Sequence, residues 1–366
     1  MFPNPTTVLA TSLTLAAFCS SIAAHDFYRC LGSPITWSSG SMTLRAHAGT
    51  FPSGSSLRTA LTDAVNAWNA CPAAFTFDLR YDEADVGRYN LQNEVWASSN
   101  DDILDGAPAI CIHWSNCANW AEADIVFDSR KPWSTSAYKT ALWPYGGSGR
   151  PFRTTALHEL GHALGLKHEA DTYNIMGEDW THIHANGSAV ICYPGEDASD
   201  GAVTLYGLAG SRPEDVGVVH WTRTSSDGEY SVHNRTRITR LDGSVCDSFT
   251  DTQFNPNGEP GYKVARGHTV VLKLNFENNG STSQSPRVRY YLSENDYITR
   301  ADTELASRRP TLNRNTVFLI EQELVIPTDL TPGRVYYLGA IVDADREIDE
   351  TDEDNNATYV AIKIKE

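Results

Sequence analysis

Hydrophobic positions recur at helical spacing in three segments of the N-terminal part of the chain. Between residues 55 and 70, apolar side chains return every three or four positions, which predicts an amphipathic helix. The same pattern predicts a helix over residues 154–164 and a short one around residues 197–206. Shorter apolar or alternating runs predict a first strand that starts at residues 34–37, before the first helix, and further strands at 75–79, 109–114 and 123–128. Residues 129–152 are rich in Gly, Pro and aromatic residues and predict a long loop.

The pattern changes to pure β after residue 262. Val270, Leu272, Leu274 and Phe276 occupy alternate positions, which describes a half-buried strand. Similar runs follow at residues 287–292, 317–326, 334–342 and 357–364, with Gly, Pro and Asn between them. This spacing is typical of a β-sandwich of roughly 100 residues. Residues 210–262 contain two strand candidates around a Ser-Ser-Asp-Gly turn and a linker-like Asn-Pro-Asn-Gly stretch, and predict a linker or β extension.

The first residues predict a targeting segment. Residues 1–23 carry no charged side chain, and an apolar run from Val8 to Phe18 is followed by small residues. This favours a secretory signal peptide, and the run is too short to span a bilayer. We therefore expect a secreted, extracellular protein without a membrane span. The expected organisation is a signal peptide (1–23), an α+β domain (24–209), a linker or β extension (210–262) and an all-β sandwich (263–366).

Charge and cysteine content narrow this picture. The formal net charge of −17 argues against a basic face that binds nucleic acid. Removal of the signal peptide leaves six cysteines, which in an oxidising compartment predict three disulfides. Six cysteines allow 15 pairings, among which the sequence does not choose. The pairing we favour is Cys111–Cys117, Cys30–Cys71 and Cys192–Cys246.

Most of the candidate metal-binding and catalytic residues lie in the stretch HELGHALGLKHEADTYNIMG, residues 158–177. On a helix, His158 and His162 lie one turn apart on the same face, where two imidazoles can bind one metal ion. Gly165 can adopt a positive φ and turn the chain, which would return His168 as a third ligand. Three nitrogen ligands leave one position of a tetrahedral zinc ion open, as in catalytic sites. Glu159 lies next to this ligand set, close enough to reach a water on the metal.

The pattern His-Glu-x-x-His-x-x-Gly-x-x-His, followed by a methionine, resembles the zinc signature of the metzincin metalloproteases. In that family the methionine forms a Met-turn beneath the metal, the role implied for Met176. The eight-residue step from His168 to Met176, the strand Ala-Asp-Ile-Val-Phe-Asp and the closing Leu-Tyr-Gly resemble the matrixin branch over roughly residues 30–209. The resemblance implies a metzincin-type α+β catalytic domain, with a mixed β-sheet and an active-site helix.

The chain also departs from that family. Glu169 follows the third histidine, where matrixins usually have Ser. No Tyr lies two residues after Met176, so a tyrosine switch of the astacin type is not expected. No histidine lies between Phe127 and His158, so a matrixin structural zinc site is not expected either. Cys30 lies in a stretch similar to a matrixin cysteine switch but close to the first expected strand, which favours a disulfide.

The resemblance implies a secreted zinc endopeptidase that hydrolyses extracellular proteins or peptides, with one catalytic Zn²⁺ and Glu159 as general base. An extended substrate would pair with residues 123–128 if that strand forms a sheet edge. Two alternatives stay open on sequence alone. One is an adhesin or binding protein with a vestigial metal site, and the other is a zinc amidase that acts on cell-wall peptides.

The C-terminal domain resembles the CARDB module, a bacterial cell-adhesion-related sandwich, over about residues 263–366. The matching stretches include Asn278-Asn279-Gly280, Tyr336-Tyr337-Leu338 and Glu353-Asp354-Asn355-Asn356. The resemblance suggests a bacterial source and implies either a passive spacer or a domain that holds the enzyme on a cell-surface or matrix polymer. Residues 343–349 are similar to a calcium loop, but Ile348 stands where Gly is needed, so calcium is only a weakly supported second ion.

Overall fold

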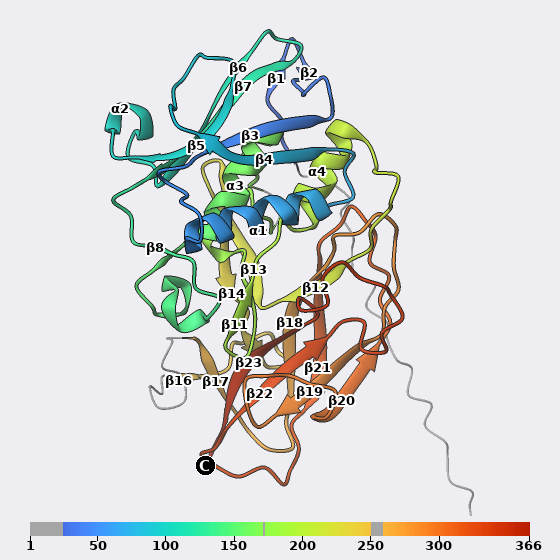
Figure 1. Ribbon diagram of the computed structural model, residues 1–366. Coiled ribbons are helices and arrows are strands. Elements are labelled where there is room, and N and C mark those ends of the chain that lie inside the picture. The colour runs from blue at the N-terminus through green and yellow to red at the C-terminus, as the bar shows by residue number, and fades with distance from the viewer. Residues whose placement is uncertain (1–24, 171–172, 250–258) are drawn as a thin grey trace, which may run out of the picture.

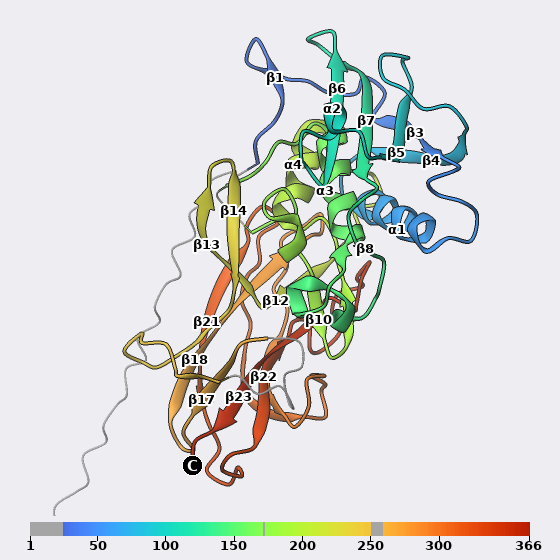
Figure 2. The ribbon, with the colours of Figure 1, turned by 90° about the vertical axis from the view of Figure 1, so that its left-hand side faces the viewer.

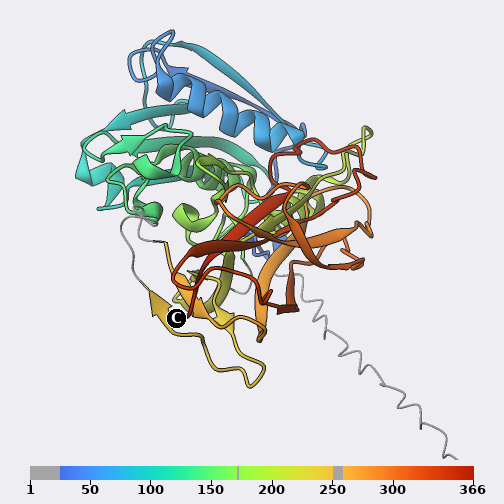
Figure 3. The same ribbon diagram turned by 90° about the horizontal axis from the view of Figure 1, so that it is seen from below.

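The computed structural model describes residues 25–170, 173–249 and 259–366, so the predicted signal peptide lies outside the described residues. Figure 1 shows an N-terminal part, blue to green, above a C-terminal part of orange and red strands. The two parts are also distinct in the view from below (Figure 3). No described helix is long and apolar enough to cross a membrane.

The N-terminal domain is built on a five-stranded mixed sheet with the order β4-β3-β5-β7-β6. Four strands run parallel, and β6 pairs antiparallel with β7 at one edge. The strands are β3 (Ser41–His47), β4 (Thr76–Glu83), β5 (Asn93–Ser98), β6 (Ala109–Ser115) and β7 (Trp120–Asp128). The predicted fold class, an α+β domain with a mixed sheet followed by an all-β sandwich, is therefore confirmed.

Helices cover one face of this sheet and carry the signature stretch. α1 (Ser56–Ala70) begins at Ser55, whose hydroxyl accepts a hydrogen bond from the Arg58 N–H, and α3 (Phe152–Leu164) packs beside it. The Trp68 indole N–H donates to the Leu157 carbonyl at 2.9 Å and ties the two helices together. The short helix α2 (Asp101–Leu104) lies against the opposite face, with Trp96 and Val126. α4 (Glu196–Tyr206) adds Ala198 and Ala202 to the main core.

The expected first strand at residues 34–37 was wrong. Residues 33–34 form only a two-residue strand, β2, which pairs with β1 (Arg29–Cys30). The strand that enters the main sheet is β3, where Met42, Leu44 and Ala46 point into the core between polar neighbours. The predicted loop at 129–152 carries only short pieces of structure: β8 (Trp133–Ser134), the 3-10 turns η1 (Lys139–Ala141) and η2 (Trp143–Tyr145), β9 (Arg150–Pro151) and the first residue of α3.

Two sheets form the sandwich. One joins β12 (Val216–Val219), β18 (Thr269–Asn278), β15 (Ile238–Thr239) and β21 (Phe318–Val325). The other has the order β16 (Ser248–Phe249), β17 (Gly261–Val264), β23 (Ala357–Ile364), β22 (Val335–Ile341), β19 (Val288–Ser293) and β20 (Thr303–Arg308). Apolar side chains such as Leu272, Phe276 and Ile362 fill the space between them. Strands β12, β15, β16 and the first half of β17 come from the segment interpreted as a linker or β extension.

One hairpin from that segment does not join either sheet. It consists of β13 (Trp221–Asp227) and β14 (Tyr230–Arg235), which pair only with each other. Figure 2 shows the hairpin rising from the sandwich along the N-terminal domain. A second small hairpin, β10 (His184–Asn186) with β11 (Ala189–Ile191), packs against β23 and so also bridges the two domains.

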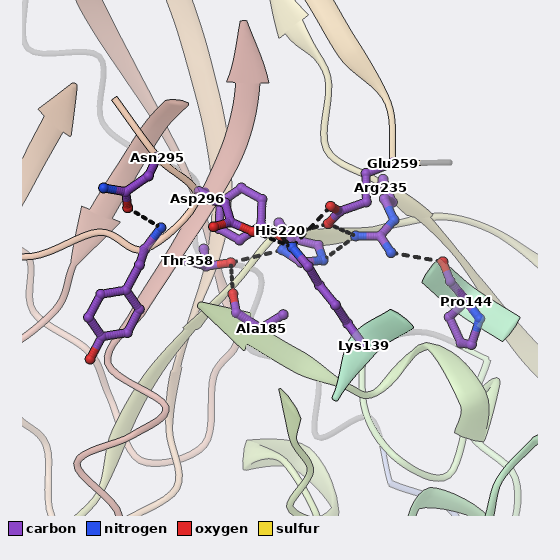
Figure 4. Close-up of polar contacts among 11 residues, drawn as sticks. Lys139, Pro144, Ala185, His220, Arg235, Glu259, Asn295, Asp296 and Thr358 are labelled. Atoms are coloured by element: carbon purple, nitrogen blue, oxygen red, sulfur yellow. Dashed lines mark hydrogen bonds and ion pairs between the residues drawn. The ribbon is translucent and has the colours of Figure 1, made fainter. Parts of the chain in front are cut away.

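A buried polar network joins the domains (Figure 4). The Lys139 side chain is almost fully buried, with its ammonium 2.7 Å from an Asp296 oxygen and 3.2 Å from a Glu259 oxygen. It also donates to the Tyr359 hydroxyl. A buried ammonium needs such counter-charges because it has lost its water shell. The sandwich is thus packed onto the N-terminal domain by an interface that contains a buried charge.

The structure replaces the predicted disulfide pairing. Cys30 is bonded to Cys117, with Cα atoms 5.3 Å apart, so the pairs Cys111–Cys117 and Cys30–Cys71 were wrong. Cys192 and Cys246 are not paired either, because they pack against the separate cores of the two domains. The reason is geometric: Cys117 lies in the turn after β6, whereas Cys111 within β6 points toward the core. Cys30 lies in a disulfide, as expected, and has no thiol available for a cysteine switch.

Candidate metal centre

Three histidines meet at the end of α3. His158 and His162 lie one turn apart on the helix, which ends at Leu164 because Gly165 adopts a φ of 112°. The turn returns His168 to the same point, as expected from the sequence. The Nε2 atom of His162 lies 3.1 Å from that of His158 and 3.0 Å from that of His168. Among the described residues, this is the one group of three or more His, Cys, Asp or Glu side chains arranged to hold a metal ion.

The other ring nitrogens explain why the Nε2 atoms converge. His158 Nδ1 donates to the Ile175 carbonyl and His162 Nδ1 to the Leu166 carbonyl, each at 2.8 Å. A neutral imidazole that donates through Nδ1 has a lone pair on Nε2. Burial lowers the pKa of all three rings, that of His168 to about 3, so they are neutral at pH 7. Converging lone pairs at this spacing suit a zinc ion about 2.0–2.1 Å from each nitrogen.

Glu159 lies beside the ligands in a dry environment. Its side chain is buried, and its Oε2 atom has no hydrogen-bond partner among the described residues. Burial raises the pKa of Glu159 to about 8; the charge of Asp179 adds to the shift and the Arg150 guanidinium opposes it. Unpartnered carboxylate oxygens at buried positions are costly, and they cluster at functional sites.

Met176 packs against the helix between the two helical histidines. A Cβ atom on Gly161 would overlap the Met176 thioether and lie 3.2 Å from the Trp68 ring. The turn that carries Met176 is closed by a 3.2 Å hydrogen bond from the Gly177 N–H to the Asn174 carbonyl. The Asn174 side chain accepts from the Met176 N–H at 2.6 Å. The methionine thus packs against the helix at Gly161, between the two helical histidines.

Several residues around the ligands had no signal in the sequence. Asp179 accepts from the Thr155 hydroxyl at 2.5 Å and lies 3.3 Å from the Arg150 guanidinium, which builds a polar layer behind His158. His113, which the sequence did not single out, donates from β6 to the His162 carbonyl at 2.8 Å. Burial lowers its pKa to about 4. Only the fold brings these groups together, because they come from three separate segments of the chain.

A second group that the sequence missed comes from the β13–β14 hairpin. The Tyr230 ring lies against the His168 ring, with centroids 4.0 Å apart. The Glu229 carboxylate lies 3.4 Å from His168 Nδ1. No spacing in the sequence connects residues 229–230 with residue 168.

The strand expected to accept an extended substrate is not at the sheet edge. β7, which contains residues 123–128, lies between β5 and β6. That expectation is corrected: the edge belongs to β6, which also packs against α3. After the turn at Cys117 the chain returns as β7, antiparallel to β6, and β7 pairs with β5 on its other side, which leaves β6 at the edge.

The remaining ion candidates have other roles in the fold. His182 and His184 are buried side chains near the domain junction, and neither belongs to a metal-binding group among the described residues. Asp343, the first residue of the stretch similar to a calcium loop, accepts backbone N–H groups of Glu347 and Ile348 at 3.0 Å each.

Comparison with known proteins identifies both domains. The Matrixin peptidase family model matches residues 36–207, and the CARDB family model matches residues 256–360. Human neutrophil collagenase is 24% identical over 159 residues, which cover 43% of this chain and 30% of the collagenase. Human matrix metalloproteinase-16 is 27% identical over 134 residues, or 35% of this chain and 21% of that protein. The chain thus spans less than a third of these relatives' length.

A solved structure of the CARDB domain of a Pyrococcus furiosus protein also matches, with 17% identity and a TM-score of 0.23. The match covers 28% of this chain and 78% of that structure.

Proposed function

We propose that this chain, which carries a matrixin peptidase domain followed by a CARDB domain, is a secreted zinc endopeptidase. His158, His162 and His168 would hold one zinc ion, and Glu159 would act as general base. The observation that carries the proposal is the convergence of three neutral Nε2 atoms beside a buried glutamate oxygen that lacks a partner. A purely structural site would gain nothing from that glutamate.

Each residue has a defined task in peptide hydrolysis. A bound zinc ion would supply Lewis acidity, which acidifies water and polarises the scissile carbonyl. Glu159 would take a proton from the attacking water and hand it to the leaving amine. The backbone carbonyls of Ile175 and Leu166 hold two imidazoles in the tautomer that presents Nε2. The close contact between Gly161 and Met176 holds helix α3 against the turn that carries Met176.

An extended peptide would bind along β6. This strand is the sheet edge nearest α3, and an edge offers unpaired N–H and C=O groups to an added strand. Substrate pairing there would bring a scissile bond toward the histidines without a dedicated side-chain pocket. Secretion is part of the proposal because residues 1–23 have the pattern of a signal peptide. Mass spectrometry of the chain recovered from the medium of its host should find an N-terminus near residue 24.

The test is cleavage of an unfolded protein by wild type, Glu159→Gln and the exposed control Glu323→Gln. We expect Glu159→Gln to lose about 100-fold or more in turnover, the lower end for a lost general base. It should retain one zinc ion, and the control should match the wild type. Full activity of Glu159→Gln would refute the assigned role. A folded, zinc-loaded wild type that cleaves neither proteins nor peptides would instead favour the binding-protein alternative.

A further inference from the structure

The β13–β14 hairpin lies outside the residues that match the matrixin family, yet it contacts the candidate metal centre. Its strands pair from Trp221 with Arg235 to Asp227 with Tyr230, and Gly228 forms the tip with a φ of 65°. The tip therefore presents two consecutive side chains, Glu229 and Tyr230, to the domain that carries the histidines.

Both side chains contact the third histidine. A Glu229 oxygen lies 3.4 Å from His168 Nδ1, and the Tyr230 ring lies at a 34° tilt against the His168 ring, 4.0 Å between centroids. The carboxylate lies on the Nδ1 side of the ring, close to hydrogen-bond distance, which favours the tautomer that carries its proton on Nδ1 and presents Nε2. The tyrosine ring restricts rotation of the imidazole.

Backbone contacts hold the hairpin in place against the loop that follows His168. The Ser231 N–H donates to the Glu169 carbonyl, and the Arg223 guanidinium donates to the Ala170 carbonyl, each at 3.0 Å. On the other side of the loop, a Cβ on Gly177 would overlap the Ser231 hydroxyl. The hairpin thus packs so closely against Gly177 that no side chain larger than hydrogen fits at this position.

The base of the hairpin is fixed at the domain junction. The Arg235 guanidinium donates to the Pro144 carbonyl at 2.8 Å and contacts His220, as Figure 4 shows. The Trp221 indole donates to the Ile183 carbonyl at 3.1 Å. The hairpin is therefore held at both ends, and its tip cannot swing away from His168 without breaking contacts at one of them.

We propose that the β13–β14 hairpin is part of the metal centre, with Glu229 and Tyr230 as the residues that position His168. The imidazoles of His158 and His162 are oriented by carbonyls within the matrixin domain, whereas the Nδ1 neighbour of His168 comes from beyond it. This inference rests on the zinc site of the proposed function. It assigns positioning, not catalysis, to both side chains.

The experiment measures zinc affinity of the full chain by competition with a chromophoric chelator. Glu229→Ala and Tyr230→Ala should each weaken zinc binding about 10- to 100-fold, the effect expected when an outer partner of a ligand is lost. Tyr230→Phe retains the ring and should bind like the wild type. Glu229→Gln, which retains an acceptor oxygen, should recover most of the affinity lost by Glu229→Ala. Glu323→Ala is the exposed control.

Replacing zinc with cobalt gives a visible absorption spectrum that reports ligand geometry. General destabilisation of the protein would not change this spectrum. The visible absorption of the cobalt protein should change in Glu229→Ala and Tyr230→Ala, because the geometry of one ligand changes, and stay constant in Tyr230→Phe. Zinc affinity and cobalt spectra unchanged in the Glu229→Ala/Tyr230→Ala double variant would overturn the inference. A wild type that binds zinc but cleaves nothing would refute the peptidase proposal alone. A wild type that binds no zinc would overturn both.

Discussion

Two regions supply the three histidines, and they are built in different ways. His158 and His162 belong to one helix, their Nδ1 partners lie within 17 residues of them, and both rings are almost fully buried. His168 lies on the return of the chain, is partly exposed, and faces a hairpin 60 residues further along the sequence. The first region is determined by local sequence, whereas the second depends on long-range packing. The position of His168 therefore depends on the junction between the domains.

The largest effect should come from loosening that junction. Lys139→Met removes the buried cation and leaves the Glu259 and Asp296 carboxylates without it. Breaking one side of a buried charge cluster costs about 3 kcal/mol, the low end of the range because Asp296 is partly exposed. We expect a clear drop in the midpoint of urea unfolding and a weaker zinc site, since the hairpin base is held there. An unchanged unfolding midpoint would show that the junction adds little stability.

A matched pair of glycine variants separates the two regions. Gly161→Ala pushes Met176 away from the ligand helix, and Gly177→Ala pushes the hairpin away from the His168 loop. Each adds one methyl group to a packed contact, which costs about 1–3 kcal/mol. We expect Gly161→Ala to lower both the thermal midpoint and zinc affinity, and Gly177→Ala to lower mainly zinc affinity. The Gly177→Ala/Tyr230→Ala double variant should lose no more zinc affinity than Gly177→Ala alone. Such a non-additive loss would confirm that both substitutions act through the hairpin.

The smallest effect concerns an acidic cluster that belongs to neither of the two regions compared above. It serves as a reference for the other variants. Asp124 is buried next to Glu122 and Glu94, and burial, with the charge of Glu122, raises its pKa to about 8. The Glu122 oxygens beside it accept hydrogen bonds from the Tyr89 and Leu91 N–H groups at 2.7 and 2.6 Å. A protonated Asp124 can share its proton with that carboxylate.

Because the folded-state pKa of Asp124 lies above its unfolded value, its contribution to stability is present at low pH and is lost as pH rises toward 8. One such group changes the free energy of unfolding by up to about 1.4 kcal/mol per pH unit. The stability of the wild type should therefore fall between about pH 5 and pH 8 and level off above that, and that of Asp124→Asn should fall less steeply. Parallel curves would refute the raised pKa. Asp215 and Glu350, with pKa values also raised to about 8, keep some slope in both proteins.

Elements with a strong local pattern were predictable. The helix at 154–164, its end at Gly165 and the return to His168 follow from spacing and from the need for a positive φ. Three strands were missed. β3 alternates regularly but follows small and polar residues that marked no clear start, and β5 and β20 show little alternation and contain several polar residues.

The sequence by itself determined two domains, the three histidines that converge at the end of one helix with their adjacent glutamate, and a methionine close to them. All of these depend on residues close together in the chain. Only the tertiary structure decided the Cys30–Cys117 pairing, the position of β6 at the sheet edge and the approach of Glu229 and Tyr230 to His168. Those features depend on which distant segments pack together. Local spacing carries no information about that choice, which is made by the burial of whole elements.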